Sequence, residues 1–175
     1  MEAGLDTGPV LLERRLPIRG EDTAGSLGDA LAVLGATAIC EALQALDSLV
    51  PRLQDAARAT YAPKIAKTEA RIDWKQPSAL IDRQVRAFNP VPGAETTLQG
   101  QPLKVWRARP VEEDGSPGRV LYSRNSRLVI GCGDGAVELL EIQRPGGRRL
   151  ATPDFLHGSP LPEGLELGEK PLASP

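Results

Sequence analysis

The 175-residue sequence predicts an α/β remnant, made of one strand and one long helix, followed by a small all-β barrel with short flanking helices. Three observations lead to this fold class. An apolar stripe with helical spacing lies in the first fifty residues, a polar and basic stretch follows it, and short strand patterns separated by turn residues come next. We therefore divide the chain into a remnant, a linker, a barrel and a tail, at residues 1–50, 51–73, 74–157 and 158–175.

The first elements are a turn and a strand. The turn occupies Gly4 to Pro9, and Gly20 ends the strand. Apolar residues alternate along residues 10–18 as they do in a half-buried strand: Val10, Leu12, Leu16 and Ile18.

A long helix is predicted next. Asp22 or Thr23 caps it, it runs to about Val50, and Pro51 closes it. Its apolar residues recur every three or four positions and form one stripe: Leu27, Leu31, Leu34, Ala38, Ala42, Ala45 and Leu49. One strand and one helix cannot bury this stripe between themselves, because stable domains consist of packed layers. Either residues 1–50 end a larger α/β domain, or the helix packs on the downstream module.

The rest of the chain predicts a linker, a barrel and a disordered tail. Pro63 interrupts the basic linker, and short helices are expected at Pro77 to Phe88 and from Thr152. The strand patterns lie at Pro102 to Ala108, Gly118 to Ser123, Arg127 to Cys132 and Ala136 to Gln143. Short antiparallel strands at this spacing indicate a closed or nearly closed barrel. The tail is rich in Pro, Gly, Ser and Glu and shows no packing pattern.

Charge is divided along the chain. The net charge of −2 consists of −5 in residues 1–50, +6 in residues 51–150 and −3 in residues 151–175. The basic middle is compatible with a polyanionic partner, and equally with a solvated surface. Cys40 and Cys132 are single and far apart, so neither a disulfide framework nor a metal site is expected. No signal peptide and no run of roughly 18 to 20 apolar residues is present, so we expect a cytoplasmic protein with no membrane partner.

The turn Gly4-Leu5-Asp6-Thr7-Gly8 is the first candidate site. Glycines on both sides let the backbone and a ligand approach Asp6 closely. Taken alone, Asp6 is also compatible with a carboxylate that only stabilises its own turn. A paired-carboxylate protease site is excluded, because the motif occurs once and a helix-rich sequence follows it.

Further blocks give this turn a context. They are Thr60-Tyr61-Ala62-Pro63-Lys64-Ile65, Glu69-Ala70-Arg71-Ile72-Asp73-Trp74, Arg86 to Ala94 and Leu103-Lys104-Val105-Trp106. In order and spacing, the chain from Met1 to about Leu156 resembles the C-terminal part of the methionyl-tRNA formyltransferases. The resemblance implies formyl transfer from 10-formyltetrahydrofolate, the co-substrate, to the amino group of methionyl initiator tRNA by a monomer. Residues 1–50 would then be the end of a Rossmann-like formyltransferase domain.

The resemblance also implies roles in catalysis. Asp6 matches the aspartate that orients and tunes a catalytic histidine, and Gly4, Leu5 and Asp6 match the folate site. The family's histidine, asparagine and Ser-Leu-Leu-Pro loop are missing from this sequence, and His157 is expected on the surface. We therefore expect residues 1–175 alone to be inactive.

The barrel of this family is similar to an oligonucleotide-binding (OB) fold and lies, with the linker, along the tRNA. The implied tRNA-binding residues are Lys64, Lys67, Arg71, Arg86, Lys104, Arg107, Arg109, Arg124, Arg127, Arg144, Arg148 and Arg149, of which we expect roughly half to be only solvated charges. Trp74 and Trp106 either stack on bases or belong to the core. Two alternatives stay open: another folate-dependent formyl enzyme (a formyltetrahydrofolate hydrolase or dehydrogenase, or a sugar-nucleotide formyltransferase), and a non-catalytic RNA-binding barrel.

Overall fold

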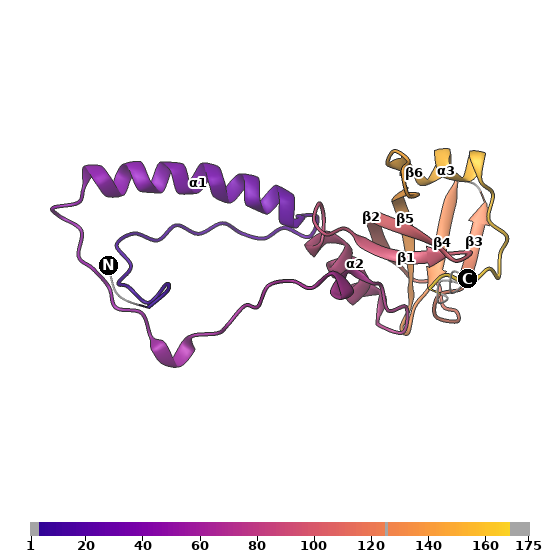
Figure 1. The fold of residues 1–175 in the computed structure, drawn as a ribbon, viewed down its shortest axis with the longest axis horizontal. Coiled ribbons are helices and arrows are strands. Elements are labelled where there is room, and N and C mark those ends of the chain that lie inside the picture. The colour runs from indigo at the N-terminus through magenta and orange to yellow at the C-terminus, as the bar shows by residue number, and fades with distance from the viewer. Residues whose placement is uncertain (1–3, 125, 169–175) are drawn as a thin grey trace. The chain divides into compact units, whose positions relative to one another are not determined.

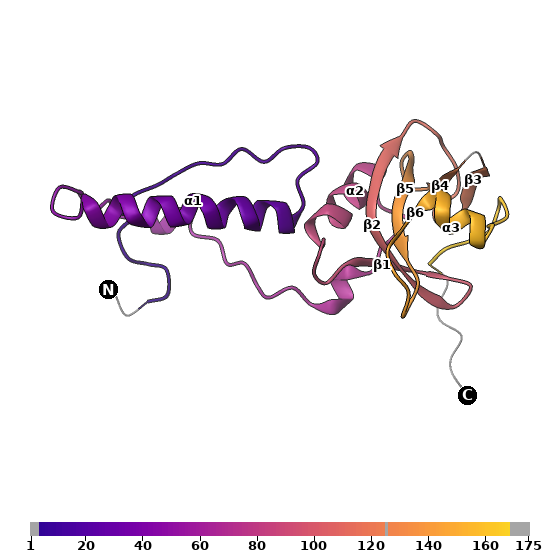
Figure 2. The ribbon, with the colours of Figure 1, turned by 90° about the horizontal axis from the view of Figure 1, so that it is seen from above.

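The computed structural model describes residues 4–124 and 126–168. The chain divides after Lys64 into two units, each of which is described by itself. Figures 1 and 2 show the long helix α1 of the first unit and the sheet of the second.

The first unit is built around α1 (Ala24–Gln44). Thr23 caps it as predicted: Thr23 Oγ1 accepts from Ser26 N at 3.1 Å, and Ser26 Oγ accepts from Thr23 N at 3.0 Å. The helix ends at Gln44, earlier than the predicted Val50. Ser48 Oγ donates to Ala45 O at 2.9 Å, and such a local bond competes with helix continuation.

The predicted strand at residues 10–18 is wrong. Only Val10 is paired, in an antiparallel bridge with Arg52, and the following residues run extended without a ladder. Leu12 and Leu16 are half-buried, but Ile18 is 75% exposed. Alternation of apolar residues was therefore not enough, because a strand also needs a neighbouring strand to receive its hydrogen bonds.

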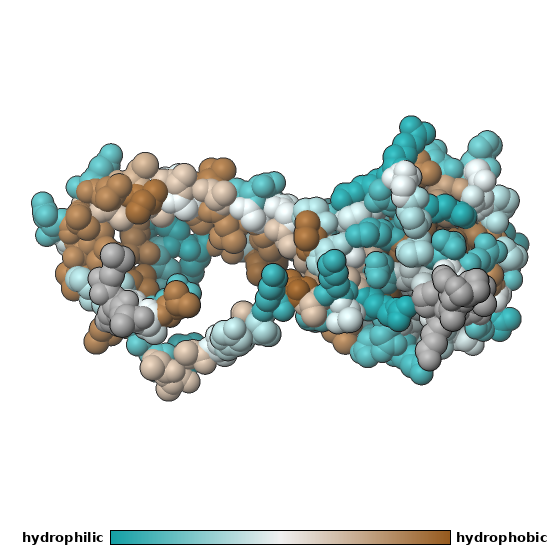
Figure 3. All heavy atoms as spheres, viewed as in Figure 1, coloured by the Kyte–Doolittle hydropathy of each residue, from teal (hydrophilic) through white to brown (hydrophobic). Residues whose placement is uncertain are grey.

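Helix α1 carries apolar residues on more than one side. The predicted stripe is half-buried except at Leu31, and no residue of the helix is fully buried. Ile39 and Leu43, outside the stripe, are 56% and 65% exposed. Figure 3 shows the resulting hydrophobic surface. By length and composition alone, this 21-residue helix is also apolar enough to cross a membrane.

The second unit contains an antiparallel sheet in the order β1-β2-β5-β4-β3, with β6 on β5. The 3₁₀ helices of the chain are η1 (Ala56–Arg58), in the first unit, and η2 (Lys67–Ala70). The remaining elements are α2 (Ser78–Ala87), β1 (Ala94–Leu98), β2 (Gln101–Val111), β3 (Val120–Arg124), β4 (Arg127–Gly131), β5 (Ala136–Gln143), β6 (Leu150–Ala151) and α3 (Thr152–Gly158).

The predicted helices and strands of this unit are confirmed, with shifts of at most a few residues, but β1 and β6 were missed. The β1–β2 hairpin turns at Gln99 and Gly100, whose φ angles are 51° and 75°. This geometry usually selects Asn or Asp before Gly, so a Gln-Gly pair gave little warning of a hairpin.

The core lies between the sheet, α2, α3 and the segment that follows α3. Ile81 and Val85 of α2 contribute to it, together with inward-facing strand residues such as Leu103, Leu128 and Ile142. Trp74 belongs to this core, and its Nε1 donates to Thr96 Oγ1 at 2.9 Å. The core role considered for Trp74 is thereby confirmed, because a buried indole needs such a partner.

The prediction of a disordered tail from residue 158 is wrong for residues 158–168, and residues 169–175 lie outside the described part. The segment 164–168 connects the two edges of the sheet. On β3, Val120 N donates to Leu165 O at 2.8 Å and Gly164 N donates to Val120 O at 2.8 Å. On the β1 side, Gly168 N donates to Thr97 O at 2.9 Å, and Leu167 is buried. The edge strands needed this cover, although the tail's composition did not show it.

Candidate functional site

The turn around Asp6 has a defined conformation. Asp6 adopts φ 57°, in the left-handed region that Asp tolerates better than most residues. Thr7 Oγ1 donates to Gly4 O at 3.1 Å, and a Cβ at position 4 would lie 2.7 Å from that Oγ1. A larger residue at position 4 would therefore displace the Thr7 hydroxyl from this hydrogen bond. Leu5 is 94% exposed, and the carboxylate-bearing Asp6 is exposed as well.

A segment that follows α1 holds the turn. Gln54 Nε2 donates to both Asp6 O and Gly8 O, each at 2.8 Å. Two backbone hydrogen bonds join Val10 and Arg52, at 2.9 and 3.0 Å. This cluster lines a hollow of about 510 Å³ whose wall includes Asp6, Arg52 and Gln54.

Charge around this hollow is mixed. Arg52 Nη2 lies 2.6 Å from Glu13 Oε2, and Arg15 Nε lies 3.1 Å from Glu13 Oε1. Hydrogen bonds from Arg15 and then Arg52 lower the pKa of Glu13 below its ordinary value. Arg52 is thus partly neutralised, so the hollow is not a strongly cationic site.

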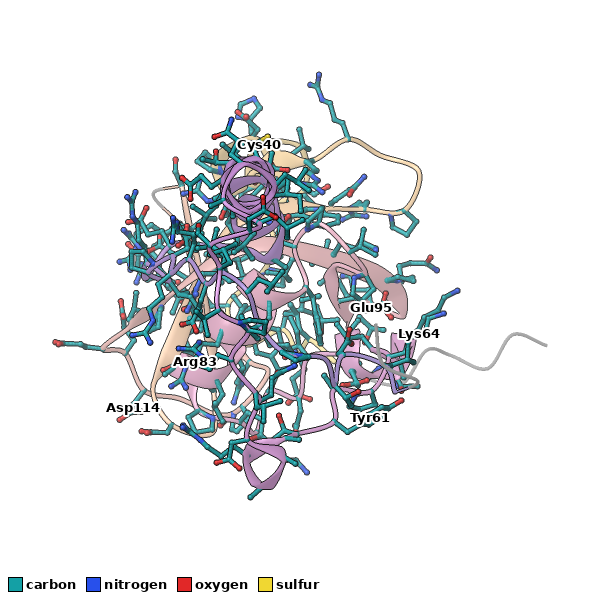
Figure 4. All side chains as sticks on the ribbon, turned by 90° about the vertical axis from the view of Figure 1, so that its left-hand side faces the viewer. Cys40, Tyr61, Lys64, Arg83, Glu95 and Asp114 are labelled. Carbon is teal, nitrogen blue, oxygen red and sulfur yellow. The ribbon has the colours of Figure 1, made fainter. Side chains whose placement is uncertain are left out.

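In the sheet unit, register places several predicted residues on one face. Arg71 bridges to Glu95 of β1, Glu95 pairs with Lys104 of β2, and Lys104 pairs with Gln143 of β5. Directly paired residues point to the same side of a sheet. We call these four residues the outer row, and Figure 4 labels Glu95.

Trp106 lies beside the outer row, outside the main core cluster, and is 5% exposed. Arg149 Cζ lies 3.5 Å from the centroid of its ring, and Lys104 Nζ lies 5.3 Å from it. Trp106 Nε1 donates to Gln143 Oε1 at 2.9 Å. Gly93, at φ 80°, allows the ring to lie close, since a Cβ there would be 2.7 Å from Trp106 Cη2. Trp106 thus supports two cations on the outer face.

Four of the predicted tRNA-binding arginines are ion-paired. Arg86 pairs with Asp82, Arg124 with Glu163, and Arg109 and Arg127 both pair with Glu138. Arg127 also contacts Glu113 at 3.3 Å. The Glu138 side chain is only 6% exposed. Burial raises the pKa of this carboxyl, but hydrogen bonds and charge from Arg109 and Arg127 outweigh burial and lower the pKa below its ordinary value.

The other eight predicted cations have no carboxylate within 4.0 Å among residues 4–124 and 126–168. They are Lys64, Lys67, Arg71, Lys104, Arg107, Arg144, Arg148 and Arg149. Arg144, Arg148 and Arg149 belong to the connection between β5 and β6. Lys64 ends the first unit, where Figure 4 labels it near Tyr61, and the other seven belong to the sheet unit.

Two residues of these sites escaped the sequence reasoning. Gln54 binds backbone carbonyls 46 and 48 residues away, and no side-chain pattern marks such a contact. The position of Gln143 beside Lys104 follows only from the pairing register of β2 and β5, which the sequence analysis did not predict. His157 is exposed, as expected.

The sheet unit is a small β domain whose outer face carries cations without carboxylate partners. The family model described as "Formyl transferase, C-terminal domain" matches residues 64–160, so the chain belongs to this family. Methionyl-tRNA formyltransferase of Thiobacillus denitrificans is 50% identical over 96% of this chain and 55% of that protein. The same enzyme from Cereibacter sphaeroides is 52% identical over 94% of this chain and 53% of that protein. The chain therefore spans about half the length of these curated relatives.

Solved structures share the fold of this chain. A variant of HypX from Aquifex aeolicus matches 93% of this chain and 30% of its own, with 26% identity and a TM-score of 0.65. HypX in complex with tetrahydrofolic acid matches 89% of this chain and 28% of its own, with 27% identity and a TM-score of 0.62.

Proposed function

We propose that this chain acts as the tRNA-binding, C-terminal part of a cytoplasmic methionyl-tRNA formyltransferase. The whole enzyme would transfer the formyl group of 10-formyltetrahydrofolate to the amino group of methionyl initiator tRNA. The observation that carries this proposal is the set of eight cations without carboxylate partners within the described residues, in a chain half identical to enzymes of that name. Ion-paired arginines have already lost much of their attraction for phosphate, whereas these eight retain it.

The two cations of the outer row, Arg71 and Lys104, and the linker lysines would bind the phosphate backbone of the tRNA, with the sheet unit as an OB-like platform. Phosphate contacts position a nucleic acid without reading its sequence. Trp106 is covered by Arg149 and therefore has no free ring face on that side for a base. Its role in this proposal is to hold the guanidinium of Arg149 and the ammonium of Lys104 on the outer face.

The turn with Asp6 would serve the reaction. The attacking amine must lose protons, an oxyanion must be stabilised, and the folate nitrogen must be protonated as it leaves. Asp6 would orient a histidine that performs proton transfer, and such general acid–base help contributes roughly 10²–10⁴-fold. Gly4 and Leu5 would border the folate in the same turn.

Helix α1 would pack against the part of the formyltransferase fold that the relatives carry outside the matched half. A helix that is apolar on several sides is normally buried in the core of a larger protein. The exposure of Ile39 and Leu43 supports this arrangement. Residues 1–50 would then be the end of the catalytic domain.

Binding of methionyl initiator tRNA to residues 1–175 tests the proposal. Lys64→Ala combined with Lys67→Ala should weaken binding about five- to tenfold at low salt and reduce the salt slope by about one to two, because up to two phosphate contacts are lost. The matched control is Arg15→Ala combined with Arg124→Ala, which removes two exposed, ion-paired charges, one from each unit. Its affinity should remain within about twofold of wild type.

Circular dichroism would confirm that both double variants keep the fold. Equal weakening in both would indicate attraction to net charge alone, and unchanged binding of the lysine variant would contradict the interface.

Activity requires a joined enzyme, in which residues 1–175 are fused to the unmatched part of the Thiobacillus denitrificans relative. Folate-dependent formylation of methionyl-tRNA is the expected result. Formylation of a sugar nucleotide instead would establish another folate-dependent enzyme. If the chain binds tRNA but the joined enzyme formylates neither substrate, residues 65–168 form a non-catalytic RNA-binding domain.

A further inference from the structure

The side-chain amide of Gln54 joins the backbone of the Asp6 turn to the segment that follows α1 through two hydrogen bonds. Its two N–H groups go to Asp6 O and Gly8 O, at 2.8 Å each. Asp6 and Gly8 flank the peptide that carries Thr7, so the amide spans the tip of the turn. This contact joins a segment before α1 to a segment after it.

We infer that Gln54 is a positioning residue, which fixes the direction of the Asp6 carboxylate by holding the two carbonyl groups of its turn. The inference rests on the proposed function, because Asp6 needs a fixed direction only if it orients a reacting group. Three sets of contacts support it: the two hydrogen bonds of Gln54, the backbone pair of Val10 with Arg52, and the ion pair of Arg52 with Glu13. The last two anchor the Gln54 segment.

The left-handed conformation of Asp6 explains why the turn needs the hydrogen bonds from Gln54. At φ 57° a non-glycine residue is strained, and the neighbouring glycines give the turn many alternative conformations. A further hydrogen bond in the turn, from Thr7 Oγ1 to Gly4 O, does not involve Asp6. Without Gln54, the turn would lose two hydrogen bonds to the segment after α1, so it can relax and move the carboxylate.

The chemistry at position 54 is specific to an amide of this length. Two carbonyl oxygens require two donors, which a primary amide supplies and a carboxylate does not. Gln54→Glu keeps the shape of the side chain, but its ionised carboxylate can only accept, and it would face the carbonyl oxygens of Asp6 and Gly8, which also only accept. Gln54→Met keeps the length without donors, and Gln54→Asn is one methylene shorter.

The first experiment uses residues 1–175 and follows the amide signals of Asp6, Thr7 and Gly8 by NMR. Gln54→Glu and Gln54→Met should shift these signals at pH 7, while signals of β2 and β5 stay in place. As pH falls through about 4.3, the protonated Glu gains one donor, so its signals should move part of the way back. Gln54→Met should show no such return, and wild type titrated in parallel corrects for Asp6 itself. Unchanged turn signals in Gln54→Glu would overturn the inference.

The second experiment uses the joined enzyme and separates positioning from general stability. Gln54→Met should lower kcat about tenfold and leave the KM for tRNA within about twofold, because misplacing a catalytic group by a small distance slows chemistry rather than binding. In an Asp6→Asn background the same substitution should cost less than about twofold, since Gln54 acts through Asp6. Equal losses in both backgrounds would show a merely structural role and refute the inference.

The two experiments separate the two claims. If the joined wild-type enzyme is inactive, the proposed function fails, and the NMR comparison alone decides whether Gln54 holds the turn. If the enzyme is active and Gln54→Met has wild-type kcat, the proposed function stands and the positioning role is rejected.

Discussion

Glu138 shows how a single buried carboxylate divides the arginines of the sheet into two kinds. It sits on β5, opposite Arg109 of β2 and Val129 of β4, and binds two guanidinium groups. One of these guanidinium groups, that of Arg127, also lies over the ring of Tyr122, with Arg127 Cζ 5.6 Å from the ring centroid. These arginines complete the structure of the sheet, whereas arginines without such a partner remain available for phosphate.

The pH dependence of stability follows from this carboxylate. Its pKa in the folded chain is below the ordinary value of 4.5, so the ionised form stabilises the fold at neutral pH. That contribution is lost as pH falls from about 4.5 through the lower pKa of the folded state. Glu138→Gln should therefore be about 1–2 kcal/mol less stable than wild type at pH 7, and the difference should shrink towards pH 3. Urea unfolding followed by tryptophan fluorescence measures this, and a constant difference across the range would refute it.

At the scale of elements, apolar spacing and turn residues predicted most helices and strands of the chain, but they missed segments whose order depends on partners far away in the sequence. Helices α1 and α2 were recognisable because their apolar residues repeat with the helical period, and strand β5 because turn residues lie on both sides of an apolar run. Strand β1 was missed because the turn that joins it to β2 is an uncommon Gln-Gly pair. Residues 164–168 were misjudged because their order comes from hydrogen bonds to strands far away in sequence.

The same limit applies to the candidate site. Asp6 and the basic residues were found from the resemblance and from charge. Whether a cation has a carboxylate partner depends largely on tertiary structure, as with Arg109 and Arg127 at Glu138, and composition does not contain this information. Gln54 was missed because its partners are carbonyl groups, which every residue carries.

The segment 164–168 should contribute measurably to the stability of the sheet. Leu167 is 4% exposed, and Gly168 beside it lies close to Trp74. Leu167→Ala should lower the free energy of unfolding by about 2–4 kcal/mol, because it removes a buried side chain and leaves a cavity. Val91→Ala, at a position 76% exposed, is the control and should change it by less than about 0.5 kcal/mol. Equal stability of the two variants in urea would show that the segment is dispensable.

At the scale of the whole molecule, the two units differ in how much of their apolar surface they bury. The sheet unit encloses its core, while α1 has no buried residue among those described. In the proposed function, hydrophobic association would therefore belong to the first unit and phosphate binding chiefly to the second.

The substitution Leu43→Lys tests whether the apolar surface of α1 packs against the rest of the enzyme. In the joined enzyme it should cost about 2–4 kcal/mol, because an unpaired charge would be buried. In residues 1–175 alone it should change stability little, because Leu43 is 65% exposed there. Gln44→Lys, at an exposed position of the same helix, is the control in both backgrounds. An equal loss of unfolding free energy in the two backgrounds would exclude packing of α1 against the rest of the enzyme. Co-sedimentation of wild type with lipid vesicles would indicate that α1 binds a membrane instead.

The position of residues 164–168 in the sequence also affects how the chain folds during translation. This segment leaves the ribosome after β1 to β6. Until then the nascent sheet has no closing segment, and the edges of β1 and β3 remain free to pair with other chains. A messenger RNA truncated between the codons for β6 and residue 164 would therefore yield a protein that aggregates, even though every strand of the sheet has been synthesised.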